Sequence, residues 1–311
     1  MNQWEPVKLE PVFKETVWGG SRLASVFGKE IPSVHTGESW EVAAHQHGQS
    51  RLVNGALAGK TLQEAIDLYP EAILGTEVYQ KHGTHFPILI KFIDAADKLS
   101  VQVHPDDALA HQLEGPEENG KTEMWVVLDA DPGAKLVYVF NRDTTKEELK
   151  TAIAQQQLEE LLCYVPVKKG DVFFIPAGTV HAIGEGILIA EIQQNSDTTY
   201  RVYDYGRIGL DGQPRALHVD KALTAAHLQA KPAADIDLTK GICCPYFAVR
   251  RQTLNGVAEL PVHKEHFEIL MILEGSMTIG GLTVKKGDSV LVPAAAGSQR
   301  LEGQAEYLQI Q

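Results

Sequence analysis

The alternation of hydrophobic and polar positions along the chain predicts a mainly β protein. Most apolar segments are short, are rich in Val, Ile, Phe and Tyr, and end at Gly, Pro, Asn or Asp, which is typical of strands. On this basis we predict strands at residues 86–93, 124–128, 135–140, 172–175, 186–193 and 267–273. Helical patterns are fewer. They cover residues 61–68, which begin with the capping-box pair Thr61 and Glu64, and residues 144–162.

Part of this pattern occurs twice. Residues 168–181 align with residues 285–298, because both begin with Lys-Lys-Gly-Asp, continue with four mostly apolar residues, and then contain Pro-Ala. The first copy ends in His181 and the second in Ser298. Residues 122–129 likewise match residues 267–274. Two related β domains explain the repeat, and the Pro- and Ala-containing residues 230–237 read as their linker, which predicts domains at 1–232 and 233–311.

Composition and charge narrow the function. The chain has 311 residues, of which 44% are hydrophobic and 22% charged, as in ordinary globular proteins. Its net charge of -13 argues against nucleic acid and anionic membranes as partners, although a few basic residues in a cleft can still bind a small anion. Three cysteines, Cys163, Cys243 and Cys244, suggest no disulfide framework. We read no secretory signal and no membrane span, and therefore expect a cytoplasmic protein.

Three predicted strands carry residues that suit a metal ion. Period-two alternation in residues 99–104 places Ser100, Gln102 and His104 on one strand face. Glu123 begins the next strand, and His181 follows a turn at Pro176-Ala-Gly. Imidazole nitrogens and carboxylate oxygens bind zinc, manganese and cobalt, and a catalytic site leaves one position open. The sequence therefore predicts one divalent metal ion at His104, Glu123 and His181.

Other histidines form weaker candidates. His45 and His47 share one strand face, and His263 and His266 lie near Glu268. Because Ser298 replaces the histidine of the first repeat, we expect the C-terminal domain to hold no metal.

Several motifs occur together in order. Residues 99–105 (Leu-Ser-Val-Gln-Val-His-Pro), 120–124 (Gly-Lys-Thr-Glu-Met), 176–181 and 191–201 together resemble the type I mannose-6-phosphate isomerase family in its short bacterial form. The resemblance runs from Trp18-Gly19 to Arg201 and continues more weakly to the C-terminus. It implies the cupin fold, a jelly-roll barrel with helical insertions plus a second, smaller cupin-like β domain. It also implies zinc-dependent interconversion of mannose 6-phosphate and fructose 6-phosphate through an enediol.

The resemblance also implies roles for individual residues. The zinc ligands would be Gln102, His104, Glu123 and His181, Arg201 and Lys121 would act in catalysis, Ser100 would help to hold the phosphate, and Lys91, Glu191 and Asp197 would line the pocket. Whether Gln102 is a direct ligand stays open. So does the group that transfers the proton, because Lys121, Glu191 and a metal-bound water all suit the task.

Two rival functions remain at this point. One is a different metal-dependent cupin enzyme, such as another sugar-phosphate isomerase or an iron oxygenase. The other is a sugar-binding protein without turnover. The sequence predicts no particular oligomeric state.

Overall fold

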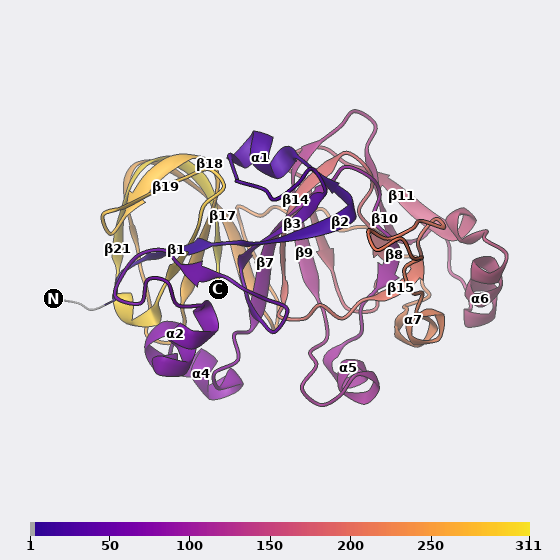
Figure 1. The fold of residues 1–311 in the computed structure, drawn as a ribbon, viewed down its shortest axis with the longest axis horizontal. Coiled ribbons are helices and arrows are strands. Elements are labelled where there is room, and N and C mark those ends of the chain that lie inside the picture. Colours follow the sequence, from indigo (N-terminus) through magenta and orange to yellow (C-terminus); the bar gives the residue numbers. More distant parts are fainter. Residues whose placement is uncertain (1–3) are drawn as a thin grey trace.

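The computed structural model describes residues 4–311 and confirms a mainly β chain of the cupin fold class. Residues 1–3, part of the N-terminal segment in which we read no secretory signal, lie outside the described residues. The strands gather in two parts, with the C-terminal strands, orange to yellow in Figure 1, on one side of the molecule. Helices cover the ends and edges of both parts (Figure 1).

The larger part contains two sheets. Six strands form the first, in the spatial order β12 (Val172–Ile175), β9 (Glu123–Ala130), β14 (Ile187–Gln194), β7 (Ile88–Ala95), β3 (Thr36–Val42) and β2 (Val12–Gly20). Five strands form the second, in the order β11 (Leu162–Pro166), β10 (Lys135–Phe140), β13 (His181–Ala182), β8 (Val101–Val103) and β15 (Tyr200–Tyr203). Side chains from both sheets, including Trp125 of β9 and Leu136 of β10, share one hydrophobic cluster. The two sheets therefore pack against each other rather than closing into one hydrogen-bonded cylinder.

The C-terminal part is one larger sheet. Its strands follow the order β16 (Ile242–Cys243), β17 (Ala248–Leu260), β21 (Gln299–Ile310), β18 (Glu268–Ile279), β20 (Ser289–Val292), β1 (Val7–Glu10) and β6 (Arg51–Leu52), and β19 (Leu282–Lys285) pairs with β18. A small hairpin joins β4 (Ala44–His45) to β5 (Gly48–Gln49). Because β1 and β6 come from the start of the chain, the N-terminal segment completes the C-terminal sheet.

The helices are short. They are α1 (Arg22–Phe27), α2 (Leu62–Leu68), α3 (Pro70–Leu74), α4 (Thr76–His82), α5 (Asp107–Leu113), α6 (Lys146–Ala154) and α7 (Val219–Ala225), with 3₁₀ turns η1 (Leu158–Leu161) and η2 (Ala294–Ala296). The capping box predicted at Thr61 is present, since its side chain accepts the Glu64 backbone N–H while the Glu64 carboxylate accepts that of Thr61. Among the described residues, no helix combines the length and the apolar character that crossing a membrane requires.

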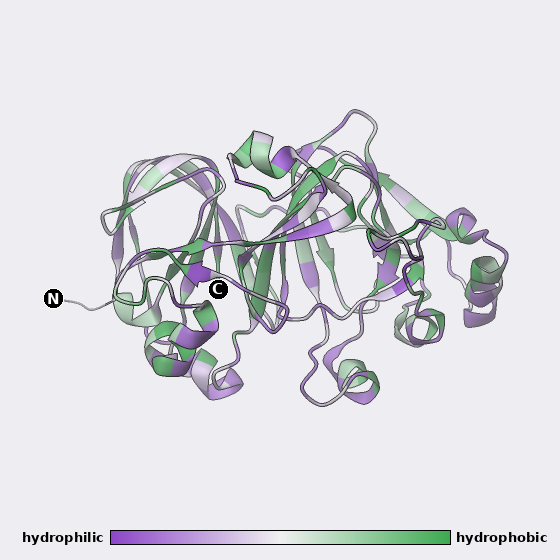
Figure 2. Ribbon diagram, viewed as in Figure 1, coloured by the Kyte–Doolittle hydropathy of each residue, from purple (hydrophilic) through white to green (hydrophobic). Residues whose placement is uncertain are grey.

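The helix predicted at 144–162 is wrong in its extent. It begins at Lys146, with Thr145 as the N-cap, and ends at Ala154. Gln156 adopts a left-handed conformation with φ of 58°, which ends the helix before the separate turn η1. In Figure 2 hydrophilic residues cover much of α6, whereas hydrophobic residues concentrate on the strands of both parts.

The internal repeat is present in the strand pairing. In the first copy β12 pairs with β9 so that Ile175 lies opposite Glu123. In the second copy β20 pairs with β18 so that Val292 lies opposite Glu268. The two copies therefore place one buried glutamate at the same point of the same strand pair. The domain boundary at residues 232 and 233 stays a prediction, and residues 230–237 form neither helix nor strand.

Candidate active site

Three predicted metal ligands converge between the two sheets of the larger part. His181 begins β13, Glu123 begins β9, and His104 follows β8. Nε2 of His181 lies 3.2 Å from Oε1 of Glu123, and Nε2 of His104 lies 3.5 Å from Oε2. All three side chains are at most 1% exposed. Strands far apart in the chain thus bring two imidazoles and one carboxylate to one point, with ligand atoms within 4.8 Å of one another.

Hydrogen bonds fix which nitrogen of each ring is free. Nδ1 of His104 lies 2.8 Å from the Thr198 carbonyl oxygen. Nδ1 of His181 lies 2.9 Å from the Thr179 carbonyl oxygen. A carbonyl only accepts, so each Nδ1 carries a proton and donates, and the neutral form of either ring has its lone pair on Nε2. Both lone pairs face Glu123, which is the arrangement that metal-binding histidines require.

The buried Glu123 carboxylate has one charged partner, the Lys121 ammonium, 3.0 Å from Oε2. Neither oxygen accepts a hydrogen bond from the described residues, although both are buried. Burial alone would raise the pKa of Glu123, but the charge of Lys121 outweighs it and holds the pKa well below its usual value. The carboxylate is therefore ionised. A buried, ionised and unsatisfied carboxylate beside two imidazole lone pairs fits a divalent cation.

Two glycines shape the segments that carry these ligands. Gly178 has φ of 84°, and its N–H donates to the His104 carbonyl oxygen at 2.8 Å. A Cβ at Gly178 would lie 2.6 Å from the ring of His227. At Gly120 a Cβ would lie 2.5 Å from the backbone of Asp106. Larger residues at either position would displace the loops that precede His181 and Glu123.

Gln102 and Lys121 lie beside the three candidate ligands. Gln102 lies opposite His181 in the strand pairing, and its Nε2 is 3.3 Å from Nε2 of His181. Rotation of the amide would present its oxygen there instead, because the two amide atoms are interchangeable in the site. Nζ of Lys121 lies 3.0 Å from Oε2 of Glu123 and 3.3 Å from Nε2 of His104.

A cavity of about 160 Å³ adjoins this cluster through Gln102. Of the predicted site residues, Ser100, Gln102, Lys91, Glu191 and Arg201 line it. A larger surface depression of about 570 Å³, around residues 131–135, contains none of them. We therefore place the candidate active site in the smaller cavity, which is next to the candidate ligands.

Lys91 lies at the centre of the charges in this cavity. Its Nζ is 3.1 Å from Oε1 of Glu191 and 3.6 Å from Oε2 of Glu38. Burial would lower the pKa of Lys91, but Glu38 and Glu191 together raise it above its usual value. Lys91 is therefore an ammonium.

Glu38 was not predicted from the sequence. Its only signal is alternation in β3, where Glu38 faces Lys91 while Glu41 faces the C-terminal sheet.

The opposite end of the cavity is rich in guanidinium groups. Arg201 donates to Ser100 Oγ and to the Ala216 carbonyl oxygen, and it forms no ion pair with the residues that the structure describes. Arg215 also lines the cavity and binds Asp204 through two N–H groups. Burial and then the charge of Arg215 lower the pKa of Arg201. This end attracts an anion. Arg215 was missed, because it lies in an irregular segment whose sequence shows no periodicity.

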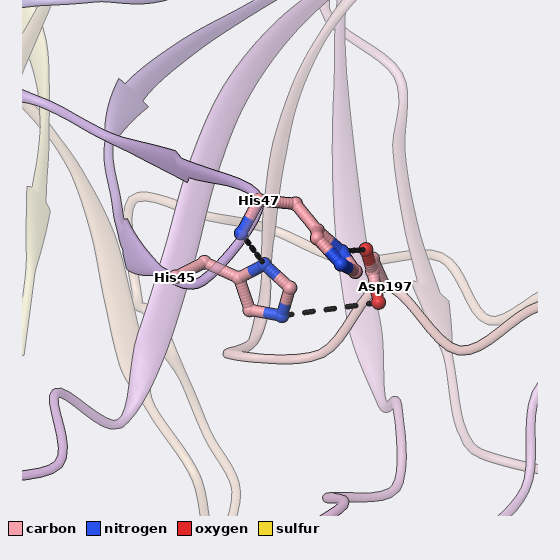
Figure 3. Close-up of side chains that lie close together, drawn as sticks. All are labelled: His45, His47 and Asp197. Carbon is pink, nitrogen blue, oxygen red and sulfur yellow. Dashed lines mark hydrogen bonds and ion pairs between the residues drawn. The ribbon is translucent and has the colours of Figure 1, made fainter.

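Asp197 has different partners. Its carboxylate lies 2.5 Å from Nδ1 of His47 and 3.8 Å from Nε2 of His45 (Figure 3). It is absent from the cavity lining, as are Lys121 and the three ligands.

In the C-terminal sheet, Glu268 accepts hydrogen bonds from Gln309 and Gln311, so two amides occupy the carboxylate that corresponds to Glu123.

Comparisons with known proteins agree with this geometry. Residues 7–159 match the family model of the catalytic domain of type I phosphomannose isomerase, and residues 238–311 match the cupin domain of mannose-6-phosphate isomerase. Mannose-6-phosphate isomerase ManA of Bacillus subtilis is 45% identical over 98% of each chain. The chain belongs to the type I phosphomannose isomerase family.

Further relatives place the chain within this isomerase family along its whole length. The probable mannose-6-phosphate isomerase GmuF of Bacillus subtilis is 40% identical over 97% of this chain and 98% of its own. The crystal structure of the Bacillus subtilis mannose 6-phosphate isomerase superposes with a TM-score of 0.88 at 36% identity, covering 99% of both chains.

Proposed function

We propose that this chain interconverts mannose 6-phosphate and fructose 6-phosphate, with zinc held by His104, Glu123 and His181. One observation carries the proposal: two imidazole lone pairs face an unsatisfied, ionised carboxylate beside a cavity that has guanidinium groups at one end. The relatives named above act, by their names, on the same sugar phosphate. An iron oxygenase would not need the basic end of the cavity.

The ligand set favours zinc. Two imidazoles and one carboxylate suit a catalytic zinc site, and Gln102 would complete the set with its amide oxygen. A divalent ion held there would supply Lewis acidity, which stabilises the negative charge that develops on the sugar during isomerisation. The carbonyl oxygens of Thr198 and Thr179 keep both rings oriented.

The arginine end would bind the phosphate. Arg201 and Arg215 both line the cavity, and Ser100 Oγ lies 3.3 Å from Nε of Arg201. Arg207 pairs with Asp97 and Asp204, and Arg215 pairs with Asp204, whereas Arg201 pairs with neither carboxylate, so one positive charge is in excess. A phosphate dianion neutralises that excess and accepts paired hydrogen bonds from planar guanidinium groups.

Proton transfer is assigned to Glu191. The enediol route moves one proton between C2 and C1, so one group must accept and return it. Lys91 is an ammonium and cannot accept a proton. Lys121 contacts Glu123 and His104 instead of lining the cavity. The Glu191 carboxylate lines the cavity, oriented by the Trp125 indole N–H at 2.9 Å.

A coupled assay tests the proposal. The protein should convert mannose 6-phosphate into fructose 6-phosphate under anaerobic conditions, lose turnover on chelation, and regain it with added zinc. Glu191→Gln should retain zinc but lose turnover by about 100-fold or more, the range that general acid–base groups supply. Glu185→Gln, at an exposed glutamate outside the cavity, is the control. Zinc-loaded protein that binds the sugar phosphate without turnover would support the rival sugar-binding function.

A further inference from the structure

His45, His47 and Asp197 form a second cluster with the residue types of a metal site (Figure 3). His45 lies in the hairpin β4–β5 and is buried, whereas the His47 side chain is 59% exposed. Asp197 lies between β14 and β15, about 150 residues later in the chain. The cluster thus joins two loops.

The hydrogen bonds of His45 argue against a metal ion in this cluster. The His47 backbone N–H donates to Nδ1 of His45 at 3.2 Å. Burial lowers the pKa of His45 even though Asp197 opposes the shift, so the ring is neutral and carries one proton. With Nδ1 accepting, that proton is on Nε2, which faces Asp197 at 3.8 Å. Nε2 therefore has no lone pair for a cation. This is the reverse of His104 and His181, whose Nδ1 atoms donate.

Both histidines thus act on the Asp197 carboxylate. Nδ1 of His47 lies 2.5 Å from Oδ2 of Asp197, and the protonated Nε2 of His45 faces Oδ1. The His45 ring is itself held edge-on against Trp40, with ring centroids 5.7 Å apart. The exposed His47 ring therefore hydrogen-bonds the carboxylate, the buried His45 ring faces its other oxygen from 3.8 Å, and we name His45, His47 and Asp197 the carboxylate clasp.

The clasp lies one peptide bond from a contact that orients a candidate metal ligand. Thr198 follows Asp197, and its carbonyl oxygen accepts the Nδ1 proton of His104 at 2.8 Å. Asn195 ties the start of this loop to the carbonyl oxygens of Ala44 and Phe86. The clasp holds the middle of the loop, next to Thr198. Ser196 Oγ also accepts the Thr198 N–H at 3.2 Å, and a movement of Asp197 would turn the neighbouring Thr198 carbonyl and redirect the His104 lone pair.

We propose that His45 and His47 are positioning residues, which hold Asp197 so that the Thr198 carbonyl keeps Nε2 of His104 directed at the metal. The inference rests on the proposed metal-dependent function. It gives Asp197 a role in the loop that supports the site rather than in the cavity. It also explains why a histidine pair that looks like a metal motif lies outside the cavity lining.

Zinc release tests the clasp without relying on turnover. His47→Ala removes the hydrogen bond from an exposed side chain to Asp197, so the variant should fold. We expect zinc to pass to an excess of chelator about 3- to 10-fold faster than from the wild-type protein, below the roughly 10- to 100-fold effect of removing a direct outer-shell partner. His47→Gln retains an N–H donor and should restore the slow rate. His111→Ala, at an exposed histidine of α5, should match the wild-type protein.

The kinetic effect has a matching signature. His47→Ala should lower kcat while changing KM for mannose 6-phosphate less than twofold, because the clasp acts on the metal ligand rather than on the cavity. A release rate equal to that of the wild-type protein would overturn the proposal, as would equal losses in His47→Ala and His47→Gln. A second equivalent of zinc in the wild-type protein that disappears in His47→Ala would also overturn it and make the cluster a metal site.

Nitrogen NMR of the zinc-free protein separates this proposal from the proposed function. The clasp requires the proton of His45 on Nε2 and that of His104 on Nδ1. If the wild-type protein neither binds zinc nor isomerises the sugar phosphate, the proposed function fails, and these two tautomers still decide the clasp. A proton on Nδ1 of His45 would overturn it.

Discussion

Glu123 and His181 begin strands in two different sheets, and their side chains meet 3.2 Å apart in a place that water does not reach. The imidazole supplies a lone pair, and the carboxylate supplies a negative charge. His181 directs a lone pair at a carboxylate whose oxygens accept no hydrogen bond from the described residues. The Lys121 ammonium compensates part of this buried charge, and a divalent cation would supply the ligand contacts that both carboxylate oxygens still lack.

Glu123→Gln tests the charge requirement. The amide retains the size of the side chain but removes the negative charge, so zinc affinity should fall by about 100-fold or more, given that even outer-shell partners are worth about 10- to 100-fold. Zinc content after desalting measures the effect. Glu268→Gln is the matched control, because it changes the corresponding buried glutamate in the second copy of the repeat. One tightly bound zinc per chain in Glu123→Gln would remove Glu123 from the ligand set.

Arg215→Ala tests the phosphate end of the cavity. Loss of a hydrogen-bonded charge is worth about 1.5–3 kcal/mol, so kcat/KM for mannose 6-phosphate should fall about 10- to 100-fold, mainly through KM. Arg207 also binds Asp204 but does not line the cavity, so Arg207→Ala should have a smaller effect. Steady-state kinetics at constant ionic strength measure both variants. Equal effects would show that Arg215 acts through Asp204 and not on the phosphate.

Acid should destabilise the zinc-free protein. Burial and the charge of Lys121 hold the pKa of His104 well below its usual value. The unfolded chain therefore binds a proton near pH 6.5 that the folded chain does not, and the free energy of unfolding falls as the pH drops from about 7 to 5. Urea unfolding in the presence of a chelator measures this free energy of unfolding at each pH. His104→Gln should lose less stability over this range, and an unchanged pH dependence would contradict the pKa shift.

A buried ion pair joins the two parts of the fold. Nζ of Lys29 lies 2.8 Å from Oε1 of Glu41, and Ser289 of the C-terminal sheet donates to Oε2. Lys29→Met leaves the carboxylate unpaired and should lower the free energy of unfolding by about 3–5 kcal/mol. Burial already raises the pKa of Glu41 in spite of Lys29, so the loss should shrink as the pH falls and the carboxylate becomes protonated.

The control for this pair is Lys8→Met. Lys8 of β1 lies within the C-terminal sheet, 2.7 Å from Asp288, and its side chain is 33% exposed. Exposed pairs contribute about 0–1 kcal/mol. Equal destabilisation in the two variants, measured by urea unfolding, would show that burial does not set the strength of the Lys29 pair.

Local patterns predicted the strands well and the partners of long-range contacts poorly. Strands β10 and β12 have the predicted bounds, because each is a short apolar run between turn residues. The end of α6 was missed, since a left-handed Gln156 leaves no mark in the sequence. The pairing of β1 with β20 was missed too, because it joins residues about 280 positions apart.

The sequence likewise predicted some residues of the candidate site and missed others. Strand alternation and the repeat identified His104, Glu123 and His181, and the structure brings these three together. Glu38 and Arg215 were not predicted, because only the tertiary fold brings them to the cavity. The different tautomers of His45 and His104 depend on backbone groups, so residue type alone could not distinguish the two histidine clusters.

Anomalous diffraction at the zinc absorption edge, from crystals grown with zinc, would locate the metal ion. We expect one strong peak per chain, bounded by Nε2 of His104, Nε2 of His181 and the Glu123 carboxylate. No peak at that point, or a peak between His45, His47 and Asp197 in its place, would contradict this expectation.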